Sequence, residues 1–372
     1  MSGALRGVRV YRDGKFGDPE DVGIDGALIA ADIDGALESG GALGSGGALG
    51  SGGALESGGS LEPGGFLIPG LIDCHVHIVG ADTLATFAAY GVTTVLDMGN
   101  PMALLAPLRG LPAVADLRAA GVVSTSPSSA HAARMHADPS VLVASAAEAD
   151  AWVAARVAEG ADYIKIVIDL PGFDQETVDA LVAAAHARGL KAVAHASRSD
   201  AVAMAQAAGV DILTHAPLDR AIGEEQATQF VSAGTIIVPT LTMMEGLVEG
   251  LRRAGIPGPA YEPARASVAA VHAAGLPILA GTDANVAPGA PSAPPFGESL
   301  HHELELLVDA GLSAAEALDA ATSLPADHFN LADRGRVEPG LRADLVLLED
   351  DPLADISATR RIRGVWVAGQ RV

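Results

Sequence analysis

Two histidines stand one residue apart at the end of an apolar run, in the segment FLIPGLIDCHVHI (66–78). In an extended strand the side chains of His75 and His77 point to the same face, because side chains alternate between faces with a period of two. Both imidazoles could therefore bind one metal ion. A core histidine beside an incidental one explains an isolated pair equally well, so partners elsewhere in the chain must decide.

Four further side chains with metal-binding or acid–base chemistry end or interrupt similar apolar runs. They are Lys165 in YIKI, His195 in VAHA, His215 in LTHA and Asp283 in GTDA. Imidazole nitrogens and carboxylate oxygens are ligands of zinc and related divalent metals. Each motif alone is weak evidence, but all four in matching places predict one shared site.

These motifs belong to a regular alternation of apolar, β-branched runs with alanine-rich helical segments. The helical segments include 174–189, with Asp174 as N-cap, and one that ends at Gly209; the apolar runs begin at residues 66, 92, 121, 163, 190, 211, 235 and 277. Eight such strands separated by helices predict an α/β fold, the (β/α)8 TIM barrel. Active sites of these barrels lie at the carboxyl ends of the strands, where the six side chains fall.

The two ends of the chain are expected to form a second, smaller unit. After a helix capped by SAAE at 313, the β-like runs ADLVLLED and GVWVAGQRV follow a barrel that is already complete, so we expect them to pair with N-terminal strands near GVRVYRDGK and DVGIDGALIAA. This predicts a small β-sandwich-like domain from residues 1–65 and 331–372, with the catalytic barrel in 66–330. Five glycine-rich hexads in 35–64 favour a low-complexity insertion over a short β-solenoid, which needs more apolar positions per turn.

Composition excludes several classes of partner. The formal net charge is −23, so nucleic acid and anionic membrane surfaces are not expected to bind. The single cysteine, Cys74, permits no intramolecular disulfide and fits a reducing compartment. Since neither a signal sequence nor a long apolar run is present, we expect a cytoplasmic protein that acts on a small molecule. The oligomeric state is left open, and a homo-oligomer is compatible with the sequence.

Lys165 has a chemistry of its own. An ammonium buried in an apolar strand is costly and has no lone pair for a metal. Burial and a nearby metal would both lower its pKa, and the neutral amine can add carbon dioxide to give a carbamate with two ligand oxygens. The alternative is a lysine whose amine reaches solvent at the barrel rim, which the accompanying histidines disfavour.

The motifs DCHVH, YIKI, VAHA, LTHA and GTDA, in this order, resemble those of the amidohydrolase superfamily, in particular its binuclear branch with a carboxylated lysine. The resemblance extends from about residue 63 to the C-terminus. The loop that leads to GESLHHELELLVDAG looks most similar to imidazolonepropionase-like and prolidase-like hydrolases.

This resemblance implies two divalent metal ions, preferably Zn²⁺, with Lys165 as a bridging N6-carboxylysine. One ion would be bound by His75, His77 and Asp283, and the other by His195 and His215. A hydroxide between the ions would attack the substrate, and Asp283 would transfer the proton to the leaving nitrogen. The expected reaction is hydrolysis of an amide C–N bond in an N-acyl amino acid, a peptide or a cyclic amide.

Three other functions are compatible with parts of this pattern. The same metals could hydrolyse a lactone, an ester or a phosphoester. A mononuclear deaminase is disfavoured, because no glutamate follows His195 closely and Lys165 is present. An inactive scaffold is disfavoured because all six metal-site residues are there.

Residues that would contact the substrate are harder to predict. His131, in the loop after the third strand, is expected to act beside the scissile carbonyl. Arg198 could bind a substrate carboxylate, and Met243 and Tyr261 could line the pocket, although each also suits an ordinary surface or core position. Ser197 stands where many prolidase-like relatives have a histidine, which puts a simple dipeptidase in doubt.

Overall fold

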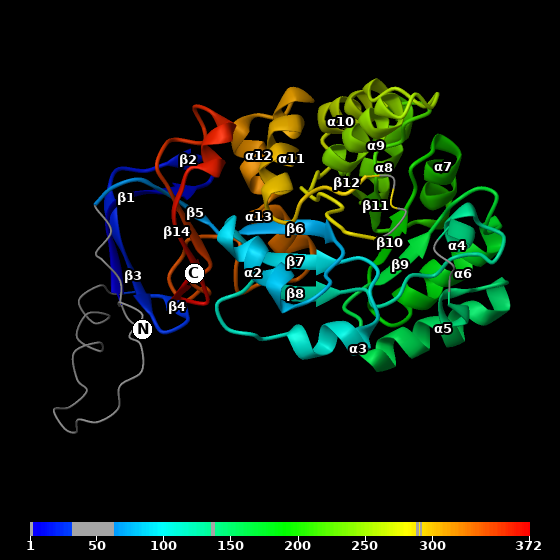
Figure 1. Ribbon diagram of the computed structural model, residues 1–372, viewed down its shortest axis with the longest axis horizontal. Helices are drawn as coiled ribbons and strands as arrows, with labels where there is room; N and C mark the ends of the chain where they lie inside the picture. Colours follow the sequence, from blue (N-terminus) through cyan, green and yellow to red (C-terminus); the bar gives the residue numbers. More distant parts are fainter. Residues whose placement is uncertain (1–2, 32–62, 135–137, 288–289, 291) are drawn as a thin grey trace.

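The computed structural model describes residues 3–31, 63–134, 138–287, 290 and 292–372. Nearly all of the predicted hexad repeat, up to residue 62, lies outside these ranges. Three sheets and the helices around them make up the described chain, and the arrangement is shown in Figure 1.

A closed ring of eight parallel segments forms the barrel. Seven are strands, in two sheets ordered β6-β7-β8 and β12-β11-β10-β9. Parallel bridges join Ser124 to Ile166 between the sheets, and Ile237 to Ile278 and Val76 to Ala284 at the eighth segment, 278–284. The strands are β6 (Leu71–Val76), β7 (Val92–Asp97), β8 (Asp116–Ala119), β9 (Ile164–Val167), β10 (Ala192–His195), β11 (Ile212–Thr214) and β12 (Ile236–Val238). The predicted fold class is therefore confirmed.

The third strand begins earlier than the predicted run at residue 121. Asp116–Ala119 pairs in register with β7, and Gly121 then takes a left-handed φ of 72° that interrupts the strand. Ser124, beyond this break, still pairs with β9. The rest of the run lies on the barrel but outside a regular strand.

Helices cover the outside of the barrel. The side chain of Asp174 accepts a hydrogen bond from Thr177 N, and Ser313 and Glu316 form a capping box, so both predicted caps are confirmed. Gly209 ends its helix in a left-handed conformation, also as predicted. The helices are α2 (Ala81–Ala89), α3 (Met102–Leu105), α4 (Ala130–Arg134), α5 (Ala146–Glu159), α6 (Gln175–His186), α7 (Ser199–Ala208), α8 (Glu224–Ala233), α9 (Leu241–Arg253), α10 (Glu262–Ala273), α11 (Glu298–Asp309), α12 (Ala314–Ala320) and α13 (Ser323–His328), with short 3-10 turns η1 (Ala106–Leu108), η2 (Pro139–Val141) and η3 (Ile356–Arg360).

Both ends of the chain contribute to an eight-stranded sheet beside the barrel (Figure 1). Its order is β15-β14-β13-β5-β1-β3-β4, and β2 pairs with β1. The strands are β1 (Gly3–Arg12), β2 (Lys15–Phe16), β3 (Glu20–Asp25), β4 (Leu28–Ile29), β5 (Phe66–Pro69), β13 (Leu345–Leu348), β14 (Ile362–Val367) and β15 (Gln370–Arg371). Strand β5 thus belongs to this sheet, and only Gly70 separates it from barrel strand β6. The division into units at residue 66 stays a prediction.

Buried polar contacts join the sheet to the barrel. The Arg334 guanidinium is 3% exposed and donates hydrogen bonds to Thr94 on β7 and Asp116 on β8. Tyr11 on β1 donates to the carbonyl of Ala315 on α12. Because a buried charge is costly without partners, the Arg334 contacts hold the segment before β13 against β7 and β8, and the Tyr11 bond holds β1 against α12.

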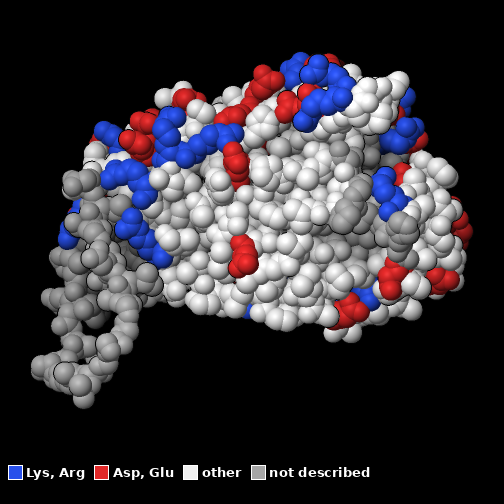
Figure 2. Space-filling model, in the orientation of Figure 1, with Lys and Arg blue, Asp and Glu red and all other residues white. Residues whose placement is uncertain are grey.

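Charged side chains on the face shown in Figure 2 lie mainly along its upper edge, where Lys and Arg alternate with Asp and Glu, and at its two ends, with Lys and Arg prominent at the left-hand end. The broad centre of this face is mostly uncharged. None of the helices in the described ranges has the length and apolar character that crossing a bilayer requires.

Candidate metal centre

Three of the predicted residues meet where β6 and the eighth segment run side by side, and we call them the Asp283 half. The Asp283 carboxylate lies 3.1 Å from His77 Nε2 and 3.5 Å from His75 Nε2. The backbone brings them together, since Asp283 N donates to the carbonyl of His75 and His77 N donates to that of Ala284. Asp283 has a φ of 58°, a left-handed conformation that aspartate tolerates better than most residues.

The buried carboxylate of Asp73 connects β6 to the eighth segment. Asp73 accepts hydrogen bonds from His75 N at 3.1 Å, Thr282 N at 3.1 Å and Thr282 Oγ1 at 2.7 Å. Burial raises the pKa of Asp73 to about 7, although all three bonds favour the ionised form. Asp73 thus fixes the backbone on both sides of the Asp283 half.

The other three predicted residues come from β9, β10 and the end of β11, and we call them the Lys165 half. His215 Nε2 lies 2.8 Å from His195 Nδ1. Threonine hydroxyls contact the Lys165 amine and the second ring nitrogen of His215. Lys165 Nζ donates to Thr214 Oγ1 at 2.7 Å, and His215 Nδ1 lies 2.6 Å from Thr240 Oγ1. All three side chains therefore point into the mouth of the barrel.

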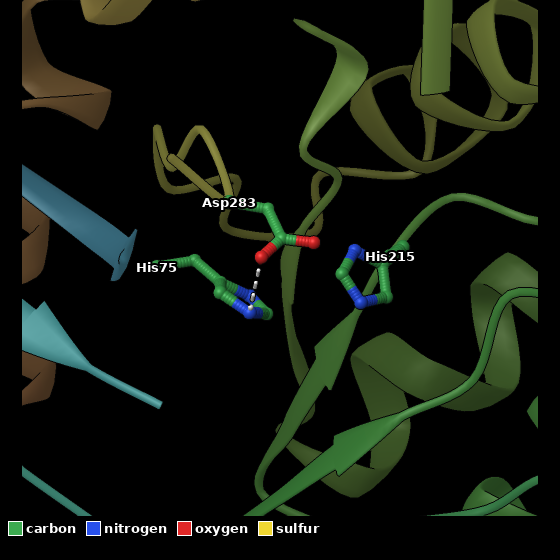
Figure 3. Close-up of side chains that lie close together, drawn as sticks. All are labelled: His75, His215 and Asp283. Carbon is green, nitrogen blue, oxygen red and sulfur yellow. Dashed lines mark ion pairs between the residues drawn. The ribbon is translucent and has the colours of Figure 1, made fainter. Parts of the chain in front are cut away.

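The two halves face each other across a space that suits a cation. His75, His215 and Asp283 each offer a ligand atom, and these atoms lie within 4.8 Å of one another (Figure 3). The rings of His75 and His215 are 4.9 Å apart between centroids. His75 Nδ1 is buried and has no hydrogen-bond partner among the described residues. A divalent metal ion fits a donor set of this kind.

The protonation states also suit metal binding. Burial, followed by the charge of Lys165 and the other histidines, lowers the pKa of His75 well below its usual value. Burial likewise lowers the pKa of His195 and of His215. For His77 burial acts in the same direction and is the largest single cause, but the hydrogen bond to Asp283 and the charges of Asp283 and Asp97 together outweigh it and raise the pKa. Neutral imidazoles keep the lone pairs that a metal requires.

Lys165 is 2% exposed, and burial lowers its pKa to about 7. The neutral amine is therefore accessible near neutral pH. This is the form that can react with carbon dioxide, so the environment of Lys165 fits the predicted carbamate chemistry.

His131 lies on α4, at the rim of the cluster. Its ring centroid is 6.1 Å from that of His195, its Nδ1 is buried without a hydrogen-bond partner among the described residues, and its backbone N donates to Asp169. Burial, then the charge of Arg134, lowers its pKa to about 4. A neutral imidazole next to the cluster can donate or accept one hydrogen bond.

The other predicted substrate residues do not meet the histidines. Arg198 is exposed and pairs with Asp200. Met243 packs in the hydrophobic core on the first turn of α9. Tyr261 precedes α10, and its buried hydroxyl lies near Glu303 and Glu245, whose charges add to burial in raising its pKa. Roles for these residues in substrate binding stay predictions.

Sequence reasoning missed the residues that orient the histidines. Thr214, Thr240 and Glu303 are buried polar side chains around the Lys165 half. Glu303 could have been found, because it interrupts an apolar face of α11 formed by Leu300, Leu304 and Leu307. His301 on the same helix is also buried. Its ring nitrogens form hydrogen bonds with the Thr359 hydroxyl and the carbonyl of Tyr90.

Comparison with known proteins relates this site to a family. Residues 66–372 match the model of the amidohydrolase family. An imidazolonepropionase of Deinococcus deserti is 31% identical over 229 residues, which are 59% of this chain and 51% of that protein, so the chain spans about half the length of this curated relative.

Solved structures share the whole fold. A Xaa-Pro dipeptidase with bound methionine in its active site superimposes with a TM-score of 0.78 and 22% identity, covering 100% of both chains. A putative prolidase from Bifidobacterium longum gives a TM-score of 0.77 and 24% identity, covering 100% of this chain and 94% of that one. Taken with the family match over most of its length, the barrel and its rim of histidines place this chain in the amidohydrolase family.

Proposed function

We propose that this protein is a metal-dependent hydrolase that cleaves an amide C–N bond in a small molecule. The observation that carries the proposal is the convergence of His75, His215 and Asp283, from three segments of the barrel, with ligand atoms within 4.8 Å of one another. Burying several histidines together costs free energy, because each polar ring loses its hydration. Such a cluster is therefore expected to have a function beyond packing.

Two divalent ions, preferably Zn²⁺, would be bound by the two halves of the cluster. The Asp283 half would bind one ion through its two histidines and the carboxylate, and His195 and His215 would bind the other. Lys165, carboxylated at Nζ, would contribute an oxygen to each. Such ions supply a Lewis acid for a carbonyl and lower the pKa of water.

Asp283 and His131 would take the remaining roles. Asp283 Oδ1, within 3.5 Å of both His75 and His77, would accept the proton of the attacking water and deliver it to the leaving nitrogen. His131, neutral and at the rim beside His195, would hydrogen-bond the substrate next to the scissile bond.

The preference for a C–N bond draws on the relatives. Imidazolonepropionase and a Xaa-Pro dipeptidase are among the proteins that this chain resembles. Lactones, esters and phosphoesters form the second class of candidates, because a water molecule activated in this site would attack any polarised centre.

The first experiment compares substrates and metal content together. N-acyl amino acids, Xaa-Pro dipeptides and cyclic amides would be assayed against lactones and phosphoesters, with metal content measured by mass spectrometry. Asp283→Asn should lower kcat by about 10²- to 10⁴-fold, as expected for loss of a general acid–base group. Asp82→Asn, a surface change on α2, is the control. An Asp283→Asn enzyme with full activity would disprove the assigned role.

A second measurement concerns Lys165. Native mass spectrometry of protein prepared with bicarbonate and zinc should show the added mass of one carbon dioxide, and Lys165→Met should lack it. If the wild-type protein binds two zinc ions without this mass, the lysine has another role.

A further inference from the structure

We propose that Glu303 is a positioning residue for the Lys165 half, which it orients through Thr240 and His215. The inference rests on the proposed function, since it concerns a histidine assigned there to the metal. The hydrogen bonds that the described residues make to Glu303 come from Leu241 and Thr242, and none comes from a histidine of the cluster. Its effect passes through the first turn of α9.

Glu303 is fully buried on α11, and its carboxylate makes three hydrogen bonds, all to the start of α9. Leu241 N donates to Oε1 at 2.9 Å, and Thr242 donates to Oε2 from both N at 2.7 Å and Oγ1 at 2.8 Å. The first amides of a helix have no partner within the helix, and a negative charge is favoured there. The carboxylate thus satisfies these amides and fixes where α9 begins.

Thr240, the residue just before α9, has an uncommon backbone conformation. Its φ is 48° and its ψ is 50°, in the left-handed region that β-branched residues rarely adopt. Its hydroxyl does not cap α9 but lies 2.6 Å from His215 Nδ1. Such a conformation persists only where the surroundings impose it. The anchored amides of the next two residues are the part of the surroundings that Glu303 supplies.

The contact with Thr240 decides which nitrogen of His215 faces the cluster. With its proton on Nδ1, donated to Thr240 Oγ1, the ring keeps a lone pair on Nε2. That nitrogen lies 2.8 Å from His195 Nδ1. An outer partner of this kind commonly sets the tautomer and the ring orientation of a metal-binding histidine. Glu303 would therefore influence metal binding while remaining outside the cluster.

The test replaces Glu303 by glutamine. The Gln side chain has a similar shape, but an NH₂ group replaces one of the two acceptor oxygens, so at least one of the three bonds from α9 is lost and we expect Thr240 to move. Glu303→Gln should weaken zinc binding at His195 and His215 by about 10- to 100-fold, measured by chelator competition. In the metal-free protein, ¹⁵N NMR should show His215 changing from one tautomer to a mixture. Glu305→Gln, on the same helix but paired with Arg360 at the surface, is the matched control.

A second variant separates positioning from stability. Thr240→Val removes the hydroxyl and leaves the three bonds of Glu303 intact, so it should give the same loss of zinc affinity. Combined with Glu303→Gln, the losses should be clearly less than additive, because both act on one contact. Thr240→Ser should restore the affinity. If Glu303→Gln fails to fold, the Val and Ser variants still test the path through Thr240.

Two results would overturn the inference. The first is a Glu303→Gln protein that is less stable but keeps the wild-type zinc affinity and His215 tautomer, which would make Glu303 only a helix cap. The second is full additivity of the two losses. If the wild-type protein binds no zinc, the proposed function fails, but the NMR measurement on His215 still decides the role of Glu303.

Discussion

The two halves of the histidine cluster are oriented by different means. In the Asp283 half, backbone hydrogen bonds between β6 and residues 282–284 align the ligands, and Asp73 binds both segments. In the Lys165 half, the contacts at the ligands come from the hydroxyls of Thr214 and Thr240. Backbone hydrogen bonds do not depend on the side chain and survive most substitutions. A hydroxyl contact, in contrast, is lost when a threonine is replaced by valine. Substitutions outside the cluster should therefore act on the Lys165 half through its two threonine hydroxyls, and on the Asp283 half mainly through Asp73.

The largest effect should come from removing the carboxylate of Asp73, which supports the Asp283 half. Asp73→Ala would leave His75 N, Thr282 N and the Thr282 hydroxyl without their buried acceptor, so we expect the free energy of unfolding to fall by about 4 kcal/mol. Zinc should be lost from the position of His75 and His77 first, in contrast to Glu303→Gln. Chemical denaturation and site occupancies from anomalous scattering measure both effects, with the surface change Asp82→Ala as control. Equal loss at both positions would contradict the division into halves.

A somewhat smaller effect should appear at acid pH in the helix that carries Glu303. Burial, then the charge of Arg360, lowers the pKa of His301 to about 4 from 6.5. Between these values the unfolded chain binds the proton and the folded protein does not. The stabilisation present above about pH 6.5 is therefore lost as the pH falls toward 4, on the order of 3 kcal/mol.

His301→Gln should remove this part of the pH dependence. Unfolding of the metal-free protein in urea, repeated across this pH range, measures it. His186→Gln, which changes a histidine on the surface of α6, is the control. A variant whose unfolding free energy follows the wild-type pH profile would show that His301 does not contribute.

The smallest effect is expected from a substitution that reduces the space around the imidazole ring of His77. A Cβ at Gly99 would lie 3.2 Å from His77 Cε1 and 3.2 Å from Val123 Cγ1, closer than most such contacts. Gly99→Ala should therefore cost about 1 kcal/mol and shift the imidazole slightly. We expect a modest rise in the zinc dissociation constant of the Asp283 half and no change in the other. Gly17→Ala, at a glycine that has open space around its Cα and no left-handed φ, is the control.

Much of the fold could be predicted from the sequence because the barrel strands are apolar runs and the helices have local caps such as Asp174 and Ser313. The ligands themselves were visible because His, Lys and Asp are unusual at strand ends. The position of the third strand could not be predicted correctly, because Gly121 interrupts an apolar run that looks continuous in the sequence.

The residues that orient the ligands were harder to predict for a physical reason. Thr214 and Thr240 look like ordinary strand residues, and only the folded backbone shows that one of them is left-handed. Glu303 acts across 62 residues of sequence, on Leu241. Contacts of that kind depend on how α9 and α11 pack, which no local pattern encodes.

The continuity of β5 and β6 limits how this protein can be shortened. A Cβ at Gly70 would lie 2.1 Å from Thr93 Oγ1, so the chain passes there through a space that only glycine fits. Strand β6, which carries His75, is thereby a direct extension of β5, which pairs with β1 and β13. An engineer seeking a minimal barrel would have to rebuild this junction, because trimming either end of the chain removes a neighbour of β5, from which the first ligand strand continues.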